Sequence, residues 1–455
     1  MMVVYKADSA VSEILEPTPV TPSTLSVPDA SGGWLSRLGR VDTRKVAVFF
    51  WGLSVVSILV WSLLPSYYTG WDVDVYKNAA LSLRAGHDPY ADAIAVQKAY
   101  QLNPHAYEPG VPIPFSYVYS PMTLPVLRAV VAVPLAVSIP LYWVLYFGMI
   151  ALGLWAVMQL PEADERKVFR LLVPFAVFFP ALLASDNILS GNVAYILYAA
   201  VLAAAVLGWR RNRWALFYVA VLLAGVFKTP MLTLLAIPLF SARRQWWPVV
   251  ATGVAGSAMF LMQPLLWPTL FKHYLEAVDL QFKFNRDFSS SPAGLVTNAL
   301  FFHVPYKITS TVCYLSYAAA ILVVFFLLSR RFLAGRLTIE QFAPVLLVGT
   351  ILLNPRIMEY DLAPITIPVA LIVWRVAGRG LGGLRAAVGM AAVFTVINIL
   401  ASRNHEGLSN PPWKITAGCF VSLVFVAGAW QLFRWSSEGR VEVEPRLEQV
   451  VEVAA

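Results

Sequence analysis

Two acidic residues, Asp72 and Asp74, come shortly after the first long apolar run of the chain. The segment that follows, 75–84, has apolar side chains at helical spacing with polar side chains opposite, which predicts a helix lying at a membrane surface. A carboxylate there could act as a general base, but an aspartate before a helix is also a common N-cap. Because residues two positions apart point in different directions on a helix, at most one of the pair is expected to be catalytic.

Three cationic residues could bind a phosphate group. Lys228 stands between two short apolar segments, where an ammonium group is costly unless it is paired or faces a polar cavity. Snorkelling of its side chain to the interface is the simpler alternative. Arg356 lies in a turn with Glu359 and Asp361, so it could bind an anion or only pair with these acids. Arg286, in the aromatic context FKFNRDF, could bind an anion or a lipid headgroup.

The elements that must position these residues are apolar helices. Of the 455 residues, 58% are hydrophobic and only 13% are charged, whereas a soluble domain has about 25% charged residues. We therefore expect an all-α polytopic membrane protein. The net charge of +8 comes from basic loops between apolar runs. The sequence lacks the basic stretches with interleaved aromatic residues that would indicate nucleic-acid binding. Cys313 and Cys419 lie inside apolar runs, and no Cys/His spacing suggests a metal site.

Lysine and arginine residues determine the expected topology, because short basic loops stay in the cytoplasm. The arrangement that keeps all basic loops inside has about twelve spans. These spans lie near residues 46–64, 139–160, 171–185, 192–208, 214–227, 230–241, 246–267, 309–329, 341–353, 361–376, 384–401 and 415–434. Both termini are then cytoplasmic, with a disordered tail at 1–43, a transmembrane domain at 44–435 and a second tail at 436–455.

This topology gathers the polar chemistry on the outer face. The first outer loop, 65–140, carries the two acids and is expected to contain interfacial helices. Its segment 118–135 has three prolines and an arginine, so we interpret it as a re-entrant or surface helix rather than a full crossing. The other outer segments are 185–192, 227–230, 268–307, 354–361 and 402–414. All five histidines, His405 among them, fall in these outer loops, which favours a site on this face.

Short motifs follow one another along these loops in a distinctive order. They are D-x-x-V-Y (72–76), G-x-x-P-Y (86–90), Tyr-Ser-Pro (119–121), Gly-Asn before a span (191–192), Lys-x-Pro (228–230), Ser-Ser-Pro (290–292) and Asn-Pro-Arg-x-x-x-Tyr-Asp (354–361). From about residue 46 to residue 376, the chain resembles the polyprenol-phosphate-mannose-dependent mannosyltransferases of glycosyltransferase family 87. The order and spacing of the motifs carry this resemblance. The chain departs from it in having Tyr-Ser-Pro where many relatives have Tyr-Pro-Pro.

The resemblance implies a GT-C fold whose active site faces the periplasmic side of a bacterial inner membrane. It implies inverting transfer of a hexose, with mannose as the expected sugar, from a polyprenyl phosphate to a glycan or glycolipid, without a metal or other cofactor. Asp72 matches the family's first-loop aspartate and would be the general base, although Asp74 leaves that assignment open. Lys228, Arg356 and Arg286 would bind the donor phosphate. Other possible substrate contacts are Asp74, Tyr76, Tyr119, Asn192, Glu359, Tyr360 and His405.

Two alternatives fit part of the pattern. Another GT-C transferase could use a lipid-linked arabinose or glucose in place of mannose. A lipid transporter would also bind a polyprenyl phosphate. A transporter, however, predicts two similar halves and ionisable residues near mid-bilayer. The chain shows no convincing repeat, and its acids stand at the edges of loops.

Overall fold

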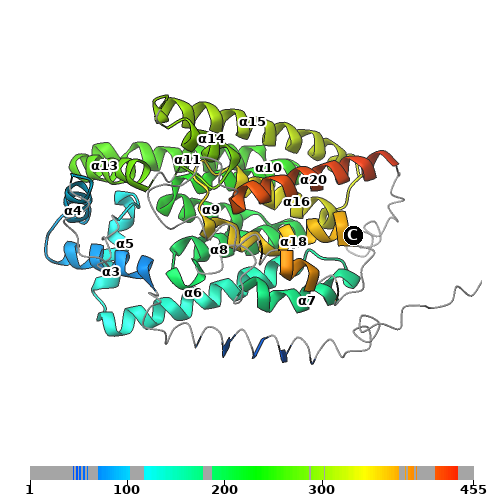
Figure 1. Cartoon of the computed structure of the whole chain (residues 1–455), viewed down its shortest axis with the longest axis horizontal. Coiled ribbons are helices and arrows are strands. Elements are labelled where there is room, and N and C mark those ends of the chain that lie inside the picture. The colour runs from blue at the N-terminus through cyan, green and yellow to red at the C-terminus, as the bar shows by residue number, and fades with distance from the viewer. Residues whose placement is uncertain are drawn as a thin grey trace, which may run out of the picture. The chain divides into compact units, whose positions relative to one another are not determined.

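The structure is a computed structural model, and it describes most of the helical part of the chain. The described residues are 45, 48–49, 51–52, 55–56, 59, 70–102, 117–177, 187–285, 288–301, 303–378, 385, 388–393, 396 and 416–438. Every regular element among them is helical (Figure 1). The tails 1–43 and 439–455 lie outside the described residues, and so do Arg286 and His405.

Within the described residues, six helical stretches are long and apolar enough to cross a membrane. They are α6 (Leu135–Val157), α8 (Val193–Arg211), the stretch Trp246–Leu266 formed by α11 and α12, α15 (Tyr306–Leu333), the stretch Tyr360–Ala377, and α20 (Ala417–Glu438). Shorter apolar segments are Pro121–Val131, α9 (Ala215–Phe227), the stretch Thr229–Ser241 formed by η5 and α10, and α16 (Ile339–Leu352). The chain is therefore a helical membrane protein, and its full number of spans stays a prediction.

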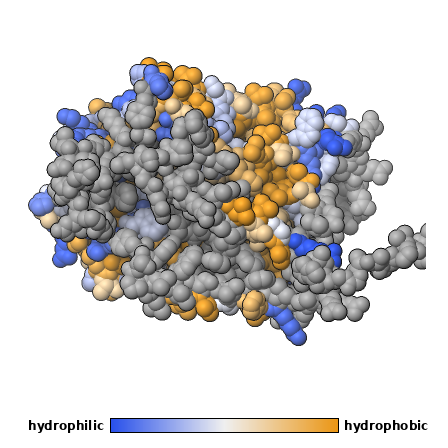
Figure 2. Space-filling model, viewed as in Figure 1, coloured by the Kyte–Doolittle hydropathy of each residue, from blue (hydrophilic) through white to orange (hydrophobic). Residues whose placement is uncertain are grey.

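Many large apolar side chains point outward from these helices. Val144, Leu223, Leu315 and Leu423 are 71%, 59%, 58% and 70% exposed. Among the coloured atoms of Figure 2, hydrophobic residues gather right of centre, and hydrophilic residues lie toward the left and right ends of the face in view. Such an extensive apolar surface is unfavourable in water but is favourable in contact with the hydrocarbon core of a bilayer.

Small residues allow the central helices to approach one another closely. A Cβ added at Gly153 of α6 would meet the Cβ of Ala199 on α8 at 2.9 Å, so these two helices touch nearly backbone to backbone. Close approach through small residues is the usual way in which helices pack inside a membrane. After α8, the chain continues through an αL residue, Asn212, into α9, which packs beside α8.

Four elements of the predicted first outer loop gather at one end of these helices (Figure 1). They are α3 (Trp71–Arg84), α4 (Ala91–Leu102), η3 (Pro121–Thr123) and α5 (Leu124–Val131). Helix α5 has eight residues, or about 12 Å, which is less than half of the hydrocarbon thickness. It does not cross the membrane by itself, and it packs against α3. α4 packs against α13 (Pro268–Asn285), where Lys98 and Glu276 form an ion pair.

Candidate active site

Asp72 lies in the first turn of α3 and does not cap it. The N-cap residue is Gly70, whose φ of 79° is left-handed, and no side chain caps the helix. The Gly70 amide donates a hydrogen bond to the Leu189 carbonyl at 2.7 Å. This bond fixes the start of α3 against η4 (Asn187–Ser190), the turn that precedes α8. The N-cap alternative for the two aspartates is therefore wrong, because glycine geometry and a backbone bond start the helix instead.

The carboxylate of Asp72 has few partners. Its Oδ2 atom is fully enclosed and accepts no hydrogen bond from the described residues. Burial raises the pKa of Asp72 above its usual value, and the side chains of Ser190 and Asn192 lower it again in part. The charge of Lys228 acts in the same direction as these two side chains. A carboxylate that burial makes more basic is a better proton acceptor than a solvated one.

Asp74 has a different environment. Its Oδ1 lies 3.2 Å from Lys77 Nζ one helical turn later, and the two side chains are 36% and 38% exposed. Ion pairs at such exposed positions contribute little to stability. The two acids therefore differ as helical geometry predicted: Asp72 adjoins buried polar groups, whereas Asp74 belongs to a surface ion pair. A catalytic role for either acid stays a prediction.

The turn beside Asp72 requires a glycine. Gly191 has a φ of 72°, and a Cβ added there would meet Val73 Cγ2 of α3 at 2.4 Å. Two tyrosines of α6 hold this turn from the other side. Tyr142 Oη donates to the Gly191 carbonyl at 2.5 Å, and Tyr146 Oη donates to the Ile188 carbonyl at 2.8 Å. The position of Asp72 thus depends on a close contact among α3, α6 and the turn before α8.

Three of the predicted substrate residues, Asn192, Tyr76 and Tyr119, have partners within the protein. Asn192 Oδ1 accepts from the Ala194 amide at 2.9 Å and caps α8, as its place before a span allowed. Tyr76 Oη accepts from the Val193 amide at 3.0 Å and lies 2.9 Å from Tyr119 Oη. These bonds tie α3 to the start of α8 and to the Tyr-Ser-Pro segment. Their first effect is to position neighbouring groups.

Lys228 lies at the break between α9 and η5 (Thr229–Leu235), where Pro230 follows and the backbone is extended. Its Nζ is 3.5 Å from Asp361 Oδ1 and 4.2 Å from the centre of the Tyr360 ring. The Lys228 side chain is only 17% exposed, and that of Asp361 is 1% exposed. Burial lowers the pKa of Lys228, while the charge of Asp361 raises it. The snorkelling alternative is wrong, because the ammonium group turns to a buried acid and an aromatic face.

A cavity of about 310 Å³ borders Lys228 and Arg356. Its walls are largely aromatic, and include Tyr119, Phe227, Tyr274, Phe288, Tyr314 and Tyr360. The charge of Arg356 lowers the pKa of Lys228, so the two cations lie within electrostatic reach of each other. Asp72 is not among the residues that line this cavity, although its charge reaches Lys228. The cations and the acid therefore occupy adjoining places rather than one open pocket.

The Tyr-Ser-Pro and G-x-x-P-Y motifs hold the neighbourhood of Lys228. Ser120 Oγ donates to the Val226 carbonyl at 2.9 Å, at the end of α9 and two residues before Lys228. Tyr90 Oη donates to the Tyr119 carbonyl at 2.8 Å. The Tyr-Ser-Pro motif thus contacts the segment that carries the lysine, and the G-x-x-P-Y motif holds the Tyr-Ser-Pro motif in turn.

The serine-rich turn, 289–291, holds the Asn-Pro-Arg motif in place by hydrogen bonds. The Ile357 amide donates to Ser289 Oγ at 3.1 Å, and the Ser290 amide donates to the Ile357 carbonyl at 2.8 Å. Ser291 Oγ then accepts from the Gly294 amide and caps α14 (Pro292–Ala299). The expectation of a cap and turn is confirmed. The same turn also braces the loop of Arg356.

Sequence reasoning missed the partner of Lys228. Asp361 was placed in a local cluster with Arg356, but it forms an ion pair with a lysine 133 positions away. The available signal was that an acid between two spans is costly without a cation. The side chain of Glu359 lies outside what the structure describes, so its predicted role stays a prediction, as do those of Arg286 and His405.

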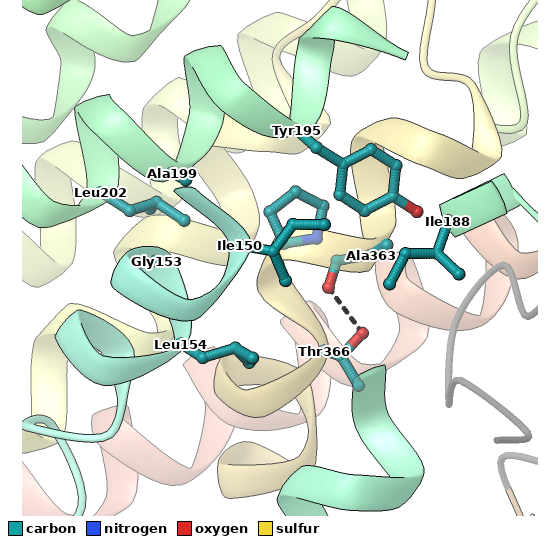
Figure 3. A pocket seen from close by; sticks show the side chains of 10 residues that line it. Ile150, Gly153, Leu154, Ile188, Tyr195, Ala199, Leu202, Ala363 and Thr366 are labelled. Carbon is teal, nitrogen blue, oxygen red and sulfur yellow. Dashed lines mark hydrogen bonds between the residues drawn. The ribbon is translucent and has the colours of Figure 1, made fainter. Parts of the chain in front are cut away.

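A smaller cavity lies between α6, α8 and η6 (Ala363–Ile365), and Figure 3 shows its lining. It measures about 40 Å³ and is lined mainly by aliphatic groups such as Ile150 and Leu202. The hydroxyl of Thr366 donates to the Ala363 carbonyl at 2.7 Å (Figure 3). An apolar cavity of this size offers nothing to a charged or sugar-bearing substrate, so it is not a candidate site.

Comparisons of the chain with family models, with curated proteins and with solved structures give no match. The class that the fold and site define is a helical membrane protein with a buried acid beside a cationic, aromatic cavity. Its function is argued from that site.

Proposed function

We propose that this protein is an inverting membrane glycosyltransferase of the GT-C type, resembling glycosyltransferase family 87. Its donor would be a polyprenyl-phosphate hexose, with mannose as the expected sugar, and its acceptor a glycan or glycolipid. The observation that supports this best is the convergence of the motifs. Segments distributed from residue 72 to residue 361 bond to one another around Lys228, with Asp72 within electrostatic reach.

The cations suit the leaving group. As the bond between the anomeric carbon and the phosphate oxygen breaks, its electron pair passes to the lipid phosphate, where negative charge develops. Lys228 and Arg356 border the cavity and would stabilise that charge. Removing one such donor in other enzymes costs about 10²–10³-fold in rate. Tyr119 and Tyr360 offer aromatic faces beside the cations, and a sugar ring could stack on such a face.

Asp72 suits the acceptor. In a single displacement, the acceptor oxygen attacks the anomeric carbon from the side opposite the phosphate, and its proton passes to the Asp72 carboxylate. The configuration at the anomeric carbon is inverted. Burial raises the pKa of Asp72, so its carboxylate accepts a proton more readily than a solvated one would. Asp72 does not line the cavity that Lys228 and Arg356 border, so a separate position for the base is compatible with attack from the side opposite the phosphate.

A lipid-linked donor explains why the cavity lies near the surface of the helix bundle. Ser310, Thr311 and Tyr314 of α15 line the cavity, while Val312 and Leu315 of the same helix are both 58% exposed. One helix therefore separates the cavity from the lipid-facing surface. The polyprenyl chain would stay in the bilayer while its phosphate reaches Lys228. With the basic loops in the cytoplasm, this end of the helices would be periplasmic.

The proposal is tested by transfer of radiolabelled mannose from polyprenyl-phosphate mannose in membranes that contain the full chain. We expect Asp72→Asn to reduce transfer by about 10²–10⁴-fold, the usual contribution of a general base, with unchanged protein levels. Asp74→Asn is the matched control and should stay within a few-fold of wild type, because its carboxylate forms a surface pair.

Loss of transfer in Asp74→Asn alone would move the base by two residues. Wild-type protein that transfers no mannose, glucose or arabinose from lipid phosphates to a broad acceptor panel would contradict the enzyme class. A polyprenyl-phosphate transporter would then explain the cationic cavity better.

A further inference from the structure

A second large cavity lies at the other end of the helices. It measures about 490 Å³, and its lining includes Trp209, Trp214, Ser241 and Arg243. Helix α8 begins beside the candidate active site and ends at Arg211, after 19 residues. At 1.5 Å per residue, α8 is about 28 Å long, so its C-terminal end lies far from Asp72. This second cavity plays no part in the proposed reaction.

The walls of this cavity are fixed by packing and hydrogen bonds. Trp209 Nε1 donates to Ser241 Oγ at 2.7 Å. The Trp214 indole packs flat on Gly208, where an added Cβ would meet the ring at 2.8 Å. Arg243 Nη2 donates to the Leu333 carbonyl at 3.1 Å, and the Arg243 side chain is otherwise exposed. One guanidinium group is thus held at the rim of a preformed aromatic pocket, with further N–H donors to offer.

The three turns that border the cavity carry eight arginines, and the nearest acid along the chain is Glu340, which follows the lining residue Ile339. Their arginines are Arg210, Arg211, Arg213, Arg243, Arg244, Arg330, Arg331 and Arg336. None of these eight residues forms an ion pair within the part of the chain that the structure describes. Positive loops by themselves follow from the topology rule, but that rule requires no cavity among them. A pocket in such a positive field is suited to an anion.

Exposed tryptophans give the level of this cavity relative to a bilayer. Trp246 and Trp247 stand at the start of α11 (Trp246–Leu261), 53% and 63% exposed, with their rings stacked at 4.1 Å. Indoles concentrate at the headgroup level of membranes. They lie three and four residues after Arg243 in the sequence, so the rim of the cavity lies where lipid phosphates lie. This placement favours a lipid over a soluble ligand.

We propose that this cavity binds the phosphate headgroup of an anionic phospholipid. Arg243 would donate to the phosphate oxygens, and Arg213, next to the lining residue Asn212, would add to the attraction. Trp209 and Trp214 would contact the glycerol and the upper acyl chain. Basic pockets between membrane helices on the cytoplasmic side are suited to such headgroups. The site does not depend on the proposed transferase activity.

The test measures binding of phosphatidylglycerol and of phosphatidylcholine to the purified full chain in detergent, by native mass spectrometry and by the shift in melting temperature. Wild type should prefer phosphatidylglycerol. Arg243→Gln should weaken phosphatidylglycerol binding about fivefold and Arg213→Gln/Arg243→Gln about thirtyfold, with phosphatidylcholine binding unchanged. The matched control is Arg84→Gln/Arg128→Gln, which removes two exposed arginines at the other end of the molecule and should leave the preference intact.

Equal binding of the two lipids by wild type would overturn the proposal. So would an equal loss in the control variant, because net charge rather than this cavity would then be responsible. Inorganic phosphate is the third ligand in the test. If it stabilises wild type as well as phosphatidylglycerol does, and loses that effect in Arg243→Gln, the ligand is a free anion and the lipid assignment is wrong.

Discussion

Two buried ion pairs near opposite ends of this protein differ in how completely they are satisfied. Arg375 donates from Nε and Nη2 to the two oxygens of Glu165, both at 2.9 Å, and from Nη1 to the Glu340 carbonyl at 2.7 Å. The two side chains of that pair are 3% and 8% exposed. Lys228 lies 3.5 Å from Asp361, at the edge of a cavity. The first pair has its hydrogen bonds complete, whereas the second leaves ammonium donors available to a ligand.

The side chains themselves explain the difference. A guanidinium group is a planar fork that matches a carboxylate with two parallel hydrogen bonds, so Arg375 and Glu165 are suited to hold helices together. An ammonium group is a compact charge whose donors point in three directions, and it can keep one acid while it meets a second anion. We infer that the arginine pair serves the fold and that the lysine pair serves the site.

The largest expected effect is on stability. Arg375→Met would leave the Glu165 carboxylate buried without its cation, which costs about 3–5 kcal/mol. Unfolding of the purified protein in mixed detergent would measure this. The double variant Arg375→Met/Glu165→Leu should recover most of the loss, because no buried charge then remains. A double variant as unstable as the single one would show that the loss of stability does not come from an unpaired buried charge at Glu165.

Lys228→Met should instead act on the reaction. We expect mannose transfer to fall about 10²–10³-fold, as on removal of a cation from a developing charge, with a smaller loss of stability than in Arg375→Met. Lys98→Met is the control, because that lysine forms an exposed ion pair between α4 and α13 and should leave transfer within a few-fold. If activity in Lys228→Met falls only in proportion to the folded fraction, the lysine is structural and the contrast between the two pairs disappears.

Gly191→Ala tests the positioning of Asp72 without touching any charge. The new Cβ would lie 2.4 Å from Val73 Cγ2, so α3 must shift away from the turn. A displacement of about 1 Å in a catalytic group costs up to about 10²-fold in rate, and kcat should fall more than KM rises. Val73→Ala in the same chain removes the closest contact, while the contact with Trp143 Cη2 at 3.0 Å and the left-handed φ remain, so it should restore part of the activity. Normal kcat in Gly191→Ala would mean that the turn does not position the base.

The pH dependence gives the smallest and most specific effects. Because burial raises the pKa of Asp72, transfer should rise with pH at a midpoint above the usual aspartate value of about 3.9. Because the pKa of Lys228 is lowered, the decrease of the transfer rate at high pH should begin at a pH below the usual lysine pKa. Lys228→Arg should move this basic limb of the pH–rate profile to higher pH. A basic limb at the same pH in Lys228→Arg would assign it to another group.

The raised pKa of Asp72 also predicts how the stability of the protein depends on pH. A carboxyl whose pKa is raised by folding favours the folded state in its protonated form. That contribution is present below the unfolded pKa and is lost as the pH rises through the folded pKa. Asp72→Asn should therefore match wild type at low pH and be more stable at neutral pH, in unfolding measurements across that range. A variant less stable than wild type at neutral pH would show that the charged carboxylate is well paired.

The sequence by itself determined the class of structure. Long apolar runs, with few charges, are stable only as helices in a bilayer, because each backbone polar group must be satisfied within its own segment. Prolines and glycines marked local features as well. Pro230 follows the break at Lys228, and the segment 118–135 forms only the short helices η3 and α5 before α6 begins. These features depend on neighbours in the chain, and local patterns report them well.

Only the tertiary structure decided which groups meet. Asp361 pairs with Lys228 across 133 positions, and Asp72 adjoins the cavity without lining it. Periodicity tells which face of a helix is buried, but not which distant helix that face meets. Partner choice depends on how several helices close on one another, through contacts such as Gly191 against Val73, and these contacts are spread over loops far apart in sequence. The candidate residues could thus be named from the sequence, while their division into base, ion pair and scaffold required the fold.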